Sequence, residues 1–412
     1  MANQGPALVV LSTLFPSVAE PVAGIFIKER MFRVARHLPV TVVAPQPWFP
    51  LLGLVRRFKP GYRPERARFE VVDGVEVHRP RFFALPGLLR RLDGLSIALA
   101  SWPLLRRLQR AGRADILDVH FGFPDGYAGC LLARWTGLPF LVTLRGKEAR
   151  LRETPAFRRR MQVAMRGAAK VIGVSSVLRD VALGLGTRPD AAIVIGNGID
   201  LAKFHPIPQA EAREQLGLAA DAQVLVSVGW LVERKGFHRV IECLAALLKT
   251  HPRLVLLIVG GPGPEGDFSE RLKQTVRDCQ VESAVRFLGP LPPDQLKVPL
   301  SAADVFVLAT RYEGWANVFL EAMACGLPVV TTRVGGNAEV VCRDDVGSLV
   351  PFDDQAALTA AIDAALNRRW DRDTILRYAE DNTWDQRIEL LIRTFRQVHE
   401  RGSRAQTRAR AQ

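Results

Sequence analysis

Residues 304–332 read D-V-F-V-L-A-T-R-Y-E-G-W-A-N-V-F-L-E-A-M-A-C-G-L-P-V-V-T-T, and this stretch decides the fold class. An apolar run over 305–308 is followed by a loop, a helical pattern over 318–325 and a second apolar run over 329–332. Continuous apolar strands that alternate with helices are typical of parallel sheets covered on both faces. The stretch therefore predicts one β-α-β unit of a doubly wound α/β domain.

Similar short apolar runs recur on both sides of this stretch. They occupy 8–11, 40–44, 116–121, 140–144, 171–174, 193–195, 224–228, 254–259 and 285–288. Together the runs predict more strands than one ordinary core accommodates, so the 412 residues predict two doubly wound, Rossmann-like domains. Asn197-Gly198, Pro206 and Pro208 interrupt the periodicity near the predicted join.

The join separates an N-terminal domain over 1–196 from a C-terminal domain over 197–380. Residues 381–402 follow the second domain, and we expect a disordered basic tail over 403–412, which is polar and basic with no apolar period.

Composition excludes several classes of protein. A chain with 48% hydrophobic and 24% charged residues is neither disordered nor fibrous. The five cysteines are scattered without metal-ligand spacing, which favours a reducing compartment. The first residues lack the pattern of a signal peptide, and four prolines within 38–55 exclude a spanning helix there. We expect a cytoplasmic protein, either soluble or peripheral at the inner face of the membrane.

The net charge of +14 is concentrated in the first half of the chain. Residues 1–196 carry +16 (30 basic, 14 acidic), whereas 197–412 carry −2 (26 basic, 28 acidic). The apolar stretch 48–55 precedes three basic residues, and 88–110 mixes Leu and Trp with five arginines. Apolar segments beside cations favour an anionic membrane surface. The alternative is that the positive charge only reflects genome composition and that the apolar loop packs inward. Arginine accounts for 47 of the 56 basic residues, as in a GC-rich genome. No nucleic-acid recognition motif is present, so we expect no nucleic-acid partner.

The strongest site candidate lies just after the strand at 305–308, since ligands of open parallel sheets bind outside the carboxyl ends of strands. Glu313 and Glu321 are eight residues apart and span at most about 12 Å if the segment is helical. The amides near Asn317 and Val318 begin a helix, where a phosphate binds favourably. This spacing indicates the two ends of one elongated ligand, and the alternative is two solvated glutamates.

A second candidate is G-W-L-V-E-R-K-G over 229–236, between a strand and a helix. Arg234 and Lys235 place cations where a diphosphate would bind, and Gly236 permits close approach of the backbone. The alternative is a solvated charge pair at a turn.

The first half contributes weaker candidates at strand ends. His120 ends the strand at 116–121, Arg145 and Lys147 follow the strand at 140–144, and Gly24 lies in the turn after the first strand. A structural histidine and a plain loop remain the alternatives for His120 and Gly24.

Two further patterns are discounted. Gly261–Gly266 matches G-x-G-x-x-G, but its two prolines remove amide donors that a dinucleotide needs. Asp371-Arg372-Asp373 opens a helical pattern, so we predict that it caps a helix and binds no metal.

Several motifs taken together resemble glycosyltransferase family 4. They are E-G-W-A-N-V-F-L-E-A-M-A-C-G-L-P-V-V (313–330), G-W-L-V-E-R-K-G (229–236), I-G-N-G-I-D (195–200), V-G-G-N-A-E-V-V (334–341) and D-V-H-F-G-F-P-D-G-Y (118–127). The resemblance implies the GT-B fold, in which two Rossmann-like domains flank an interdomain cleft and a C-terminal helix (384–400) crosses back to the N-terminal domain.

The resemblance also implies roles for individual residues. Glu321 would bind the ribose hydroxyls of a nucleotide sugar, and Glu313 would contact the transferred sugar near its C3 hydroxyl. Lys235 would pair with the diphosphate, helped by the amides around Asn317 and Val318, and His120 would lie beside the transferred sugar. The remaining residues assigned by motif are Gly24, Gly229, Arg234, Gly236 and Gly314 on the donor side, and Arg145 and Lys147 on the acceptor side.

The chain departs from the family pattern at two positions. Trp230 stands where an arginine is common, so one phosphate contact is absent or moved to Arg234. Arg145-Gly146 stands where His-Gly is common in the family. An acceptor role that the family assigns to its histidine therefore does not carry over directly to Arg145.

The expected function is that of a retaining, metal-independent hexosyltransferase without a cofactor. Its donor would be a UDP- or GDP-sugar, and its acceptor a hydroxyl of a polyprenyl-linked saccharide in cell-surface or exopolysaccharide synthesis. We expect same-face transfer, in which the departing phosphate helps to deprotonate the acceptor, because no second carboxylate is spaced to act as nucleophile. The alternative is a non-catalytic protein that binds nucleotide sugar or polyanion.

Overall fold

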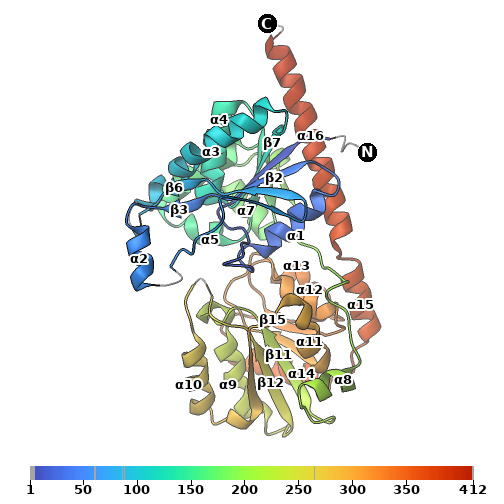
Figure 1. Ribbon diagram of the computed structural model, residues 1–412. Coiled ribbons are helices and arrows are strands. Elements are labelled where there is room, and N and C mark those ends of the chain that lie inside the picture. The colour runs from blue at the N-terminus through green and yellow to red at the C-terminus, as the bar shows by residue number, and fades with distance from the viewer. Residues whose placement is uncertain (1–4, 60–61, 86, 88, 264, 411–412) are drawn as a thin grey trace. The chain divides into compact units, whose positions relative to one another are not determined.

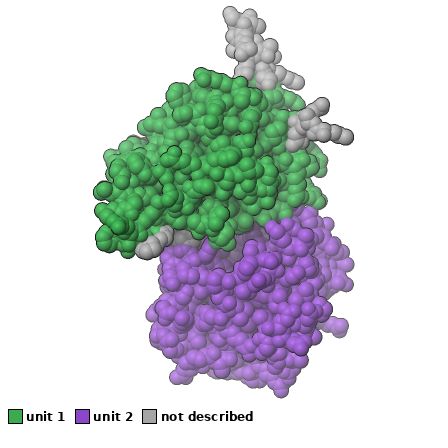
Figure 2. Space-filling view, in the orientation of Figure 1, with its two compact units in different colours: residues 1–197, 385–412 green, residues 198–384 purple. Residues whose placement is uncertain are grey.

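The computed structural model describes residues 5–59, 62–85, 87, 89–263 and 265–410, with the side chains of 403–410 left aside. The chain divides into two compact units, which Figure 2 colours separately. Unit 1 comprises 1–197 and 385–412, and unit 2 comprises 198–384. The C-terminal helix is therefore part of unit 1, although unit 2 separates the two in sequence.

Unit 1 contains an eight-stranded sheet in the order β10-β9-β8-β7-β1-β2-β5-β4. Its strands are β1 (Leu8–Leu11), β2 (Val40–Val43), β4 (Phe69–Val72), β5 (Val75–His78), β7 (Ile116–His120), β8 (Phe140–Leu144), β9 (Lys170–Gly173) and β10 (Ala192–Val194). All neighbours are parallel except β4 and β5, which form an antiparallel hairpin across Asp73-Gly74. The central strands β1, β7 and β8 are buried along their whole length, as a sheet covered on both faces requires.

The helices of unit 1 flank this sheet, apart from the short α2, which lies off to its side (Figure 1). They are α1 (Ile25–Val34), α2 (Leu52–Phe58), α3 (Asp93–Arg110), α4 (Tyr127–Thr136), α5 (Lys147–Leu151), α6 (Pro155–Gly167), α7 (Ser176–Gly184) and α16 (Trp384–Arg410). Short helical turns lie at Arg90–Leu92, Gly122–Gly126 and Pro189–Ala191. A separate two-stranded ribbon pairs β3 (Gln46–Trp48) with β6 (Arg81–Phe83).

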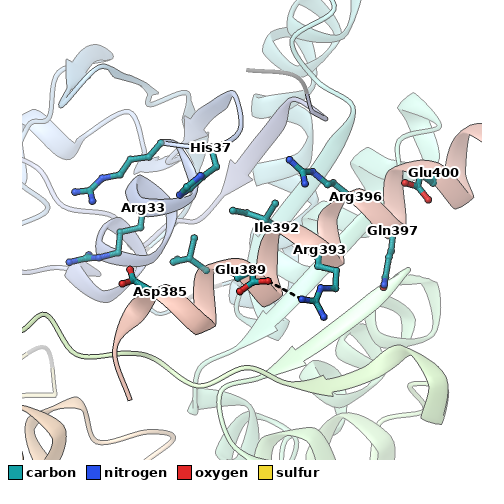
Figure 3. Close-up of a pocket in the computed structure, with 11 residues that line it drawn as sticks. Arg33, His37, Asp385, Glu389, Ile392, Arg393, Arg396, Gln397 and Glu400 are labelled. Carbon is teal, nitrogen blue, oxygen red and sulfur yellow. Dashed lines mark hydrogen bonds and ion pairs between the residues drawn. The ribbon is translucent and has the colours of Figure 1, made fainter. Parts of the chain in front are cut away.

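A cavity of about 600 Å³ lies between α16 and the residues around the end of α1, namely Arg33, Arg36 and His37 (Figure 3). Its lining carries both signs of charge, including Arg36 and Arg396 as cations and Asp385 and Glu400 as anions.

Unit 2 contains a six-stranded parallel sheet in the order β13-β12-β11-β14-β15-β16. Its strands are β11 (Gln223–Val228), β12 (Leu254–Val259), β13 (Val285–Gly289), β14 (Val305–Leu308), β15 (Val329–Thr332) and β16 (Gly347–Val350). Its helices are α8 (Gln209–Gln215), α9 (Phe237–Leu247), α10 (Ser269–Asp278), α11 (Lys297–Ala302), α12 (Asn317–Met323), α13 (Asn337–Val340), α14 (Gln355–Asn367) and α15 (Arg372–Glu380). Short turns lie at Glu233–Lys235, Glu282–Ala284 and Pro293–Gln295.

Both sheets are doubly wound, which confirms the predicted fold class. In unit 2 the chain runs outward from β11 to β13 and then returns to the other side of β11 with β14. The switch point of unit 2 thus lies between β11 and β14, and that of unit 1 lies between β1 and β7. Such switch points are where open α/β sheets bind ligands.

Several local predictions need correction. The helix predicted over 318–325 is α12, Asn317–Met323, and it ends before Gly326, whose φ of 74° is left-handed. The tail predicted as disordered from 403 is helical through Arg410, because α16 continues into a stretch rich in arginine and alanine, which favour helix. Residues 411–412 of that predicted tail lie outside the described residues.

The capping role predicted for the discounted D-x-D pattern is confirmed. Asp371 caps α15, because its side chain accepts hydrogen bonds from the backbone N–H groups of Asp373 and Thr374. Among the described residues, every helix is too short or too polar to cross a bilayer.

Candidate functional site

The switch point of unit 2 brings together two of the predicted residues. Lys235 ends the turn that links β11 to α9, and Glu313 lies in the loop that links β14 to α12. Lys235 Nζ lies 2.7 Å from Glu313 Oε1, and Glu313 is only 8% exposed. The two motifs, 78 residues apart, therefore meet as one partly buried charge pair.

Glu313 has two further partners. Arg234 Nη1 lies 3.3 Å from Glu313 Oε1, and the Thr310 hydroxyl donates to the same oxygen at 3.3 Å. Arg234 also bonds Glu265, with Nη2 3.0 Å from Oε1. Burial alone would lower the pKa of Arg234, but its bonds to Glu265 and Glu313 outweigh burial and raise that pKa above its ordinary value. The predicted diphosphate cation Arg234 is thus held by two carboxylates.

Two glycines allow the loops of this edge to approach each other. Gly236 has a φ of 73°, and a Cβ there would lie 1.9 Å from the Ala309 carbonyl oxygen. Gly335, in the loop after β15, has a φ of 51°, and a Cβ there would lie 1.8 Å from the Glu313 carbonyl oxygen. Any other residue at either position would push the Lys235 or Glu313 loop out of place.

The other predicted donor residues lie on the same edge of unit 2. Gly229 directly follows β11, and a Cβ there would lie 3.5 Å from Lys235 Cε. Gly314 follows Glu313, Asn317 and Val318 are the first residues of α12, and the half-buried Glu321 lies one turn further along that helix.

Trp230, at the first departure from the family pattern, packs beside the loop that carries Glu265. A Cβ on Gly263 would lie 2.9 Å from Trp230 Cβ, and Trp230 remains 37% exposed. The discounted Gly261–Gly266 pattern is therefore the loop that brings Glu265 to Arg234.

The switch point of unit 1 is bridged by a buried carboxylate. Asp125, in the turn after β7, accepts hydrogen bonds from Thr13 N–H and Thr13 Oγ1, each at 3.0 Å. Thr13 lies in the loop after β1. Burial raises the pKa of Asp125 to about 7, although the Thr13 bonds and the Lys147 charge oppose that shift.

His120, the last residue of β7, is fully buried. Its Nδ1 lies 3.2 Å from Arg145 Nη2, and its Nε2 lies 3.4 Å from Asp118 Oδ2. A guanidinium can only donate, so Nδ1 accepts and the neutral ring carries its proton on Nε2. Burial is the main cause that lowers the pKa of His120 to about 4, and Arg145 and Arg30 lower it further. The ring is therefore neutral near pH 7.

Arg145 belongs to a network with His120 rather than to a free acceptor surface. Its Nη1 donates to Asn197 Oδ1 at 2.9 Å, and its guanidinium lies 5.1 Å from the centroid of the Phe26 ring. Burial lowers the pKa of Arg145. Lys147, predicted beside it, is exposed, with Nζ 5.2 Å from the centroid of the Phe121 ring.

Arg30 completes this network. Arg30 of α1 is fully buried and donates to the carbonyls of Ile195 (2.7 Å) and Gly196 (2.9 Å) and to Asn197 Oδ1 (3.2 Å). Burial lowers its pKa to about 10. Gly24, assigned by motif to the donor side, precedes α1 in the same unit.

Sequence reasoning missed several residues of these two edges. They are Thr310, Glu265 and Gly335 in unit 2, and Arg30, Asp118, Asp125, Glu148 and Asn197 in unit 1. Glu148 is fully buried and accepts from the N–H groups of Gly122 and Gly146, each at 2.8 Å. One signal was present, because Arg30 interrupts the apolar face that α1 buries.

Within the part of the chain that the structure describes, no three His, Cys, Asp or Glu side chains cluster as a metal site requires.

The two doubly wound units match proteins of the GT-B glycosyltransferase fold. The chain aligns with sucrose-phosphate synthase from Thermosynechococcus elongatus at a TM-score of 0.72 and 21% identity, covering 98% of this chain and 100% of that one. It aligns with Anabaena Alr3699/HepE, solved in complex with UDP-glucose, at a TM-score of 0.62 and 21% identity, covering 91% and 98%.

Sequence comparison identifies the family. Residues 30–203 match the model for Glycosyltransferase Family 4, and residues 208–382 match that for Glycosyl transferases group 1. The chain is 32% identical to a D-inositol 3-phosphate glycosyltransferase of Acidothermus cellulolyticus, over 70% of this chain and 68% of that protein. It is 29% identical to TuaC of Bacillus subtilis, a protein named for teichuronic acid biosynthesis, over 79% and 80%. The chain belongs to glycosyltransferase family 4.

Proposed function

We propose that this glycosyltransferase moves a sugar, with retention, from a nucleoside-diphosphate sugar to a hydroxyl of a saccharide acceptor. The observation that carries the proposal is the Lys235–Glu313 pair of 2.7 Å at the switch point of unit 2. In this proposal unit 2 binds the donor and unit 1 binds the acceptor. The UDP-glucose complex of the similarly folded HepE supports a nucleotide-sugar donor.

Charge explains how this edge would assist departure of the nucleoside diphosphate. Negative charge grows on the diphosphate as the glycosidic bond breaks, and fixed cations stabilise it best in a partly desolvated site. The Lys235 side chain is only 12% exposed, and Arg234 lies beside it. Lys235 would pair with the diphosphate, while Glu313 and Glu321 would bind the sugar and the ribose, as the family resemblance implies.

The surroundings of Glu313 favour a hydrogen-bonding role over attack on the sugar. Its Oε1 accepts from Lys235, Arg234 and Thr310, which disperses the charge that a nucleophile needs. We therefore propose same-face transfer in which the departing phosphate helps to deprotonate the acceptor hydroxyl. A covalent glycosyl–Glu313 adduct, detected by mass spectrometry of the trapped enzyme, would contradict this mechanism.

Metal independence forms part of the same proposal. Lys235 and Arg234 supply positive charge where the diphosphate would depart, so no divalent ion is needed for that purpose. Turnover should persist after dialysis against EDTA, and loss of turnover that Mg²⁺ or Mn²⁺ restores would contradict this part.

The proposed acceptor is a polyprenyl-linked saccharide in cell-surface polysaccharide synthesis, presented at the cytoplasmic face of the membrane. Two observations support it: the name of the relative TuaC refers to teichuronic acid, and residues 1–196 carry a charge of +16. In assays that contain vesicles, a lipid-linked saccharide should therefore accept the sugar faster than a water-soluble saccharide of the same sugar sequence.

Hydrolysis of candidate donors by the pure protein tests the proposal. UDP- and GDP-sugars are first ranked by thermal shift, and then assayed for slow release of the sugar. The proposal expects hydrolysis that Lys235→Met reduces and Lys249→Met, a change at an exposed lysine of unit 2, leaves unchanged. Donor binding without hydrolysis or transfer would instead indicate a non-catalytic nucleotide-sugar binding protein.

A further inference from the structure

Large apolar side chains are exposed mainly in two segments of unit 1, 48–58 and 83–102. Ten of the eighteen exposed large apolar residues of the described chain lie in these two segments. Their members are Trp48, Leu51, Leu54, Phe58, Phe83, Leu89, Leu92, Leu95, Leu99 and Trp102. Soluble proteins seldom expose so many in one region unless it binds a partner.

Helix α3 has apolar residues on its outward face as well as on its buried face. Leu92, which precedes the helix, and Leu95, Leu99 and Trp102 follow one another at intervals of three and four residues, so they line one side. Their exposed fractions run from 40% to 56%. The opposite side, with Ile97 and Leu105 among others, is buried in unit 1. The outward stripe is therefore not needed for the core of this unit.

The ribbon of β3 and β6 links this stripe to α2. The Ser96 hydroxyl of α3 donates to the Phe83 carbonyl at 2.9 Å, and Phe83 is paired in register with Trp48. Helix α2 begins four residues after Trp48 (Figure 1). The exposed apolar residues of α2, the ribbon and α3 thus lie on linked elements, and together we call them the α2–α3 surface.

The apolar stretch 48–55 packs inward only in part. Phe49 and Leu52 are buried, whereas Trp48 is 38% exposed, Leu51 64% and Leu54 51%. Phe58, at the end of α2, is 80% exposed. Some large apolar side chains of this stretch therefore contribute to the core, and others face outward.

The charge of the α2–α3 surface is mainly positive. Residues 46–59 and 81–110 contain nine basic residues and one acidic residue, Asp93. Arg57, Lys59, Arg90, Arg91, Arg107 and Arg110 are exposed. An apolar face rimmed by cations complements the anionic headgroups and acyl chains of a membrane. A second copy of the same surface would oppose cation to cation, which disfavours self-association as the use of these residues.

We propose that the α2–α3 surface docks unit 1 onto an anionic lipid bilayer. Leu54 and Phe58 of α2 and Leu95, Leu99 and Trp102 of α3 enter the headgroup region, and the exposed basic residues contact lipid phosphates. This docking does not depend on the donor chemistry of unit 2, so it can be tested without a substrate.

Co-sedimentation of the full chain with vesicles tests the proposal. Vesicles of dioleoylphosphatidylcholine with 30% dioleoylphosphatidylglycerol should bind the protein, pure phosphatidylcholine vesicles should bind it weakly, and added salt should reduce the binding. Leu95→Ser/Leu99→Ser should weaken partitioning at least about tenfold, because two apolar anchors are lost. Arg57→Gln/Lys59→Gln should weaken it by about thirtyfold.

Matched controls lie outside this surface. Leu390→Ser on α16 removes a leucine that is also 38% exposed, and Lys249→Gln/Arg253→Gln removes two exposed cations from unit 2. Both controls should bind vesicles like the parent chain. Circular dichroism and thermal unfolding verify that the variants are folded. If Leu95→Ser/Leu99→Ser does not fold, Arg57→Gln/Lys59→Gln still tests the proposal.

Three results would overturn the proposal. They are no binding of the parent chain to anionic vesicles, equal loss of binding in the controls, and binding that ignores both salt and lipid charge. Concentration-dependent dimers that Leu95→Ser/Leu99→Ser abolishes would assign the surface to self-association instead.

Discussion

The two switch points use charge in opposite ways. In unit 2 the carboxylate Glu313 meets Lys235 and Arg234 in loops near the surface, and Glu265 balances Arg234 from outside. In unit 1 the arginines at 30 and 145 share Asn197 in a buried network that also holds His120 in its neutral form. We propose from this difference that the edge of unit 2 exchanges partners for a ligand, whereas the edge of unit 1 is held by its own contacts.

The largest expected effect tests the exchangeable edge. Lys235→Met removes the ammonium group that pairs with Glu313, and we expect donor turnover to fall about 10²- to 10³-fold because charge on the leaving diphosphate loses its main cation. Steady-state hydrolysis or transfer measures this loss, with Lys249→Met as control. If the turnover of Lys235→Met stayed within about threefold of the parent's, the edge of unit 2 would not bind the donor through Lys235, and the contrast with unit 1 would fail.

The next effect concerns Asp125 in the fixed edge. Its pKa is raised from 3.8 to about 7, so the folded state holds a proton that the unfolded state releases, and this contribution is lost as pH rises from about 4 to about 7. Asp125→Asn has no such proton to lose. Its free energy of unfolding, relative to that of the parent, should therefore rise by about 4 kcal/mol as pH increases from about 4 to about 7. Urea unfolding at several pH values measures the difference, with the exposed Asp373→Asn as control. A flat difference would show that Asp125 is ionised throughout.

His120 should produce the opposite slope. Its pKa of about 4 lies below the ordinary 6.5, so its contribution is present above pH 6.5 and is lost as pH falls toward 4. The loss amounts to about 3 kcal/mol, and His120→Gln should remove it. The same urea experiment measures it, with exposed His37→Gln as control. Equal slopes in the His120 variant and the parent would contradict a neutral buried ring.

A smaller effect sharpens the role of Arg145 at the same ring. Arg145 donates to His120 Nδ1, so nitrogen NMR of the parent at pH 7 should show the tautomer protonated on Nε2. Arg145→Met removes that donor and a nearby positive charge, so the pKa of His120 should rise. A tautomer protonated on Nδ1 in the parent would show that the contact is not a hydrogen bond.

The smallest effect belongs to the outer partner of Arg234. Glu265 is 43% exposed, and exposed pairs contribute at most about 1 kcal/mol. Glu265→Gln should therefore change both stability and donor turnover only slightly, as thermal unfolding and steady-state rates would show. A loss comparable to that of Lys235→Met would make Glu265 part of the donor site.

Local sequence patterns predicted most of the fold. The runs at 8–11, 140–144, 254–259, 305–308 and 329–332 match strands residue for residue, because each consists of apolar and β-branched residues without a charge and is almost wholly buried. The hairpin of β4 and β5 was missed although its alternating pattern and Asp73-Gly74 turn were visible in the sequence. The ribbon of β3 and β6 has strands of three residues, which carry too little pattern to detect.

The site at the edge of unit 2 was easier to predict from the sequence than the network at the edge of unit 1. The Lys235 and Glu313 motifs are compact and follow strands, so position alone indicated them. The contacts of Arg30 with Asn197 and of Thr13 with Asp125 join residues more than a hundred positions apart. Such contacts depend on which strands become neighbours, and a single sequence does not specify that order.

The position of a bound donor tests the central claim most directly. A structure of the full chain with a nucleotide sugar chosen by the thermal-shift screen should place diphosphate oxygens about 3 Å from Lys235 Nζ, at the edge of β11 and β14. A diphosphate bound instead at the edge of β7 and β8, with Lys235 still paired only with Glu313, would contradict the account.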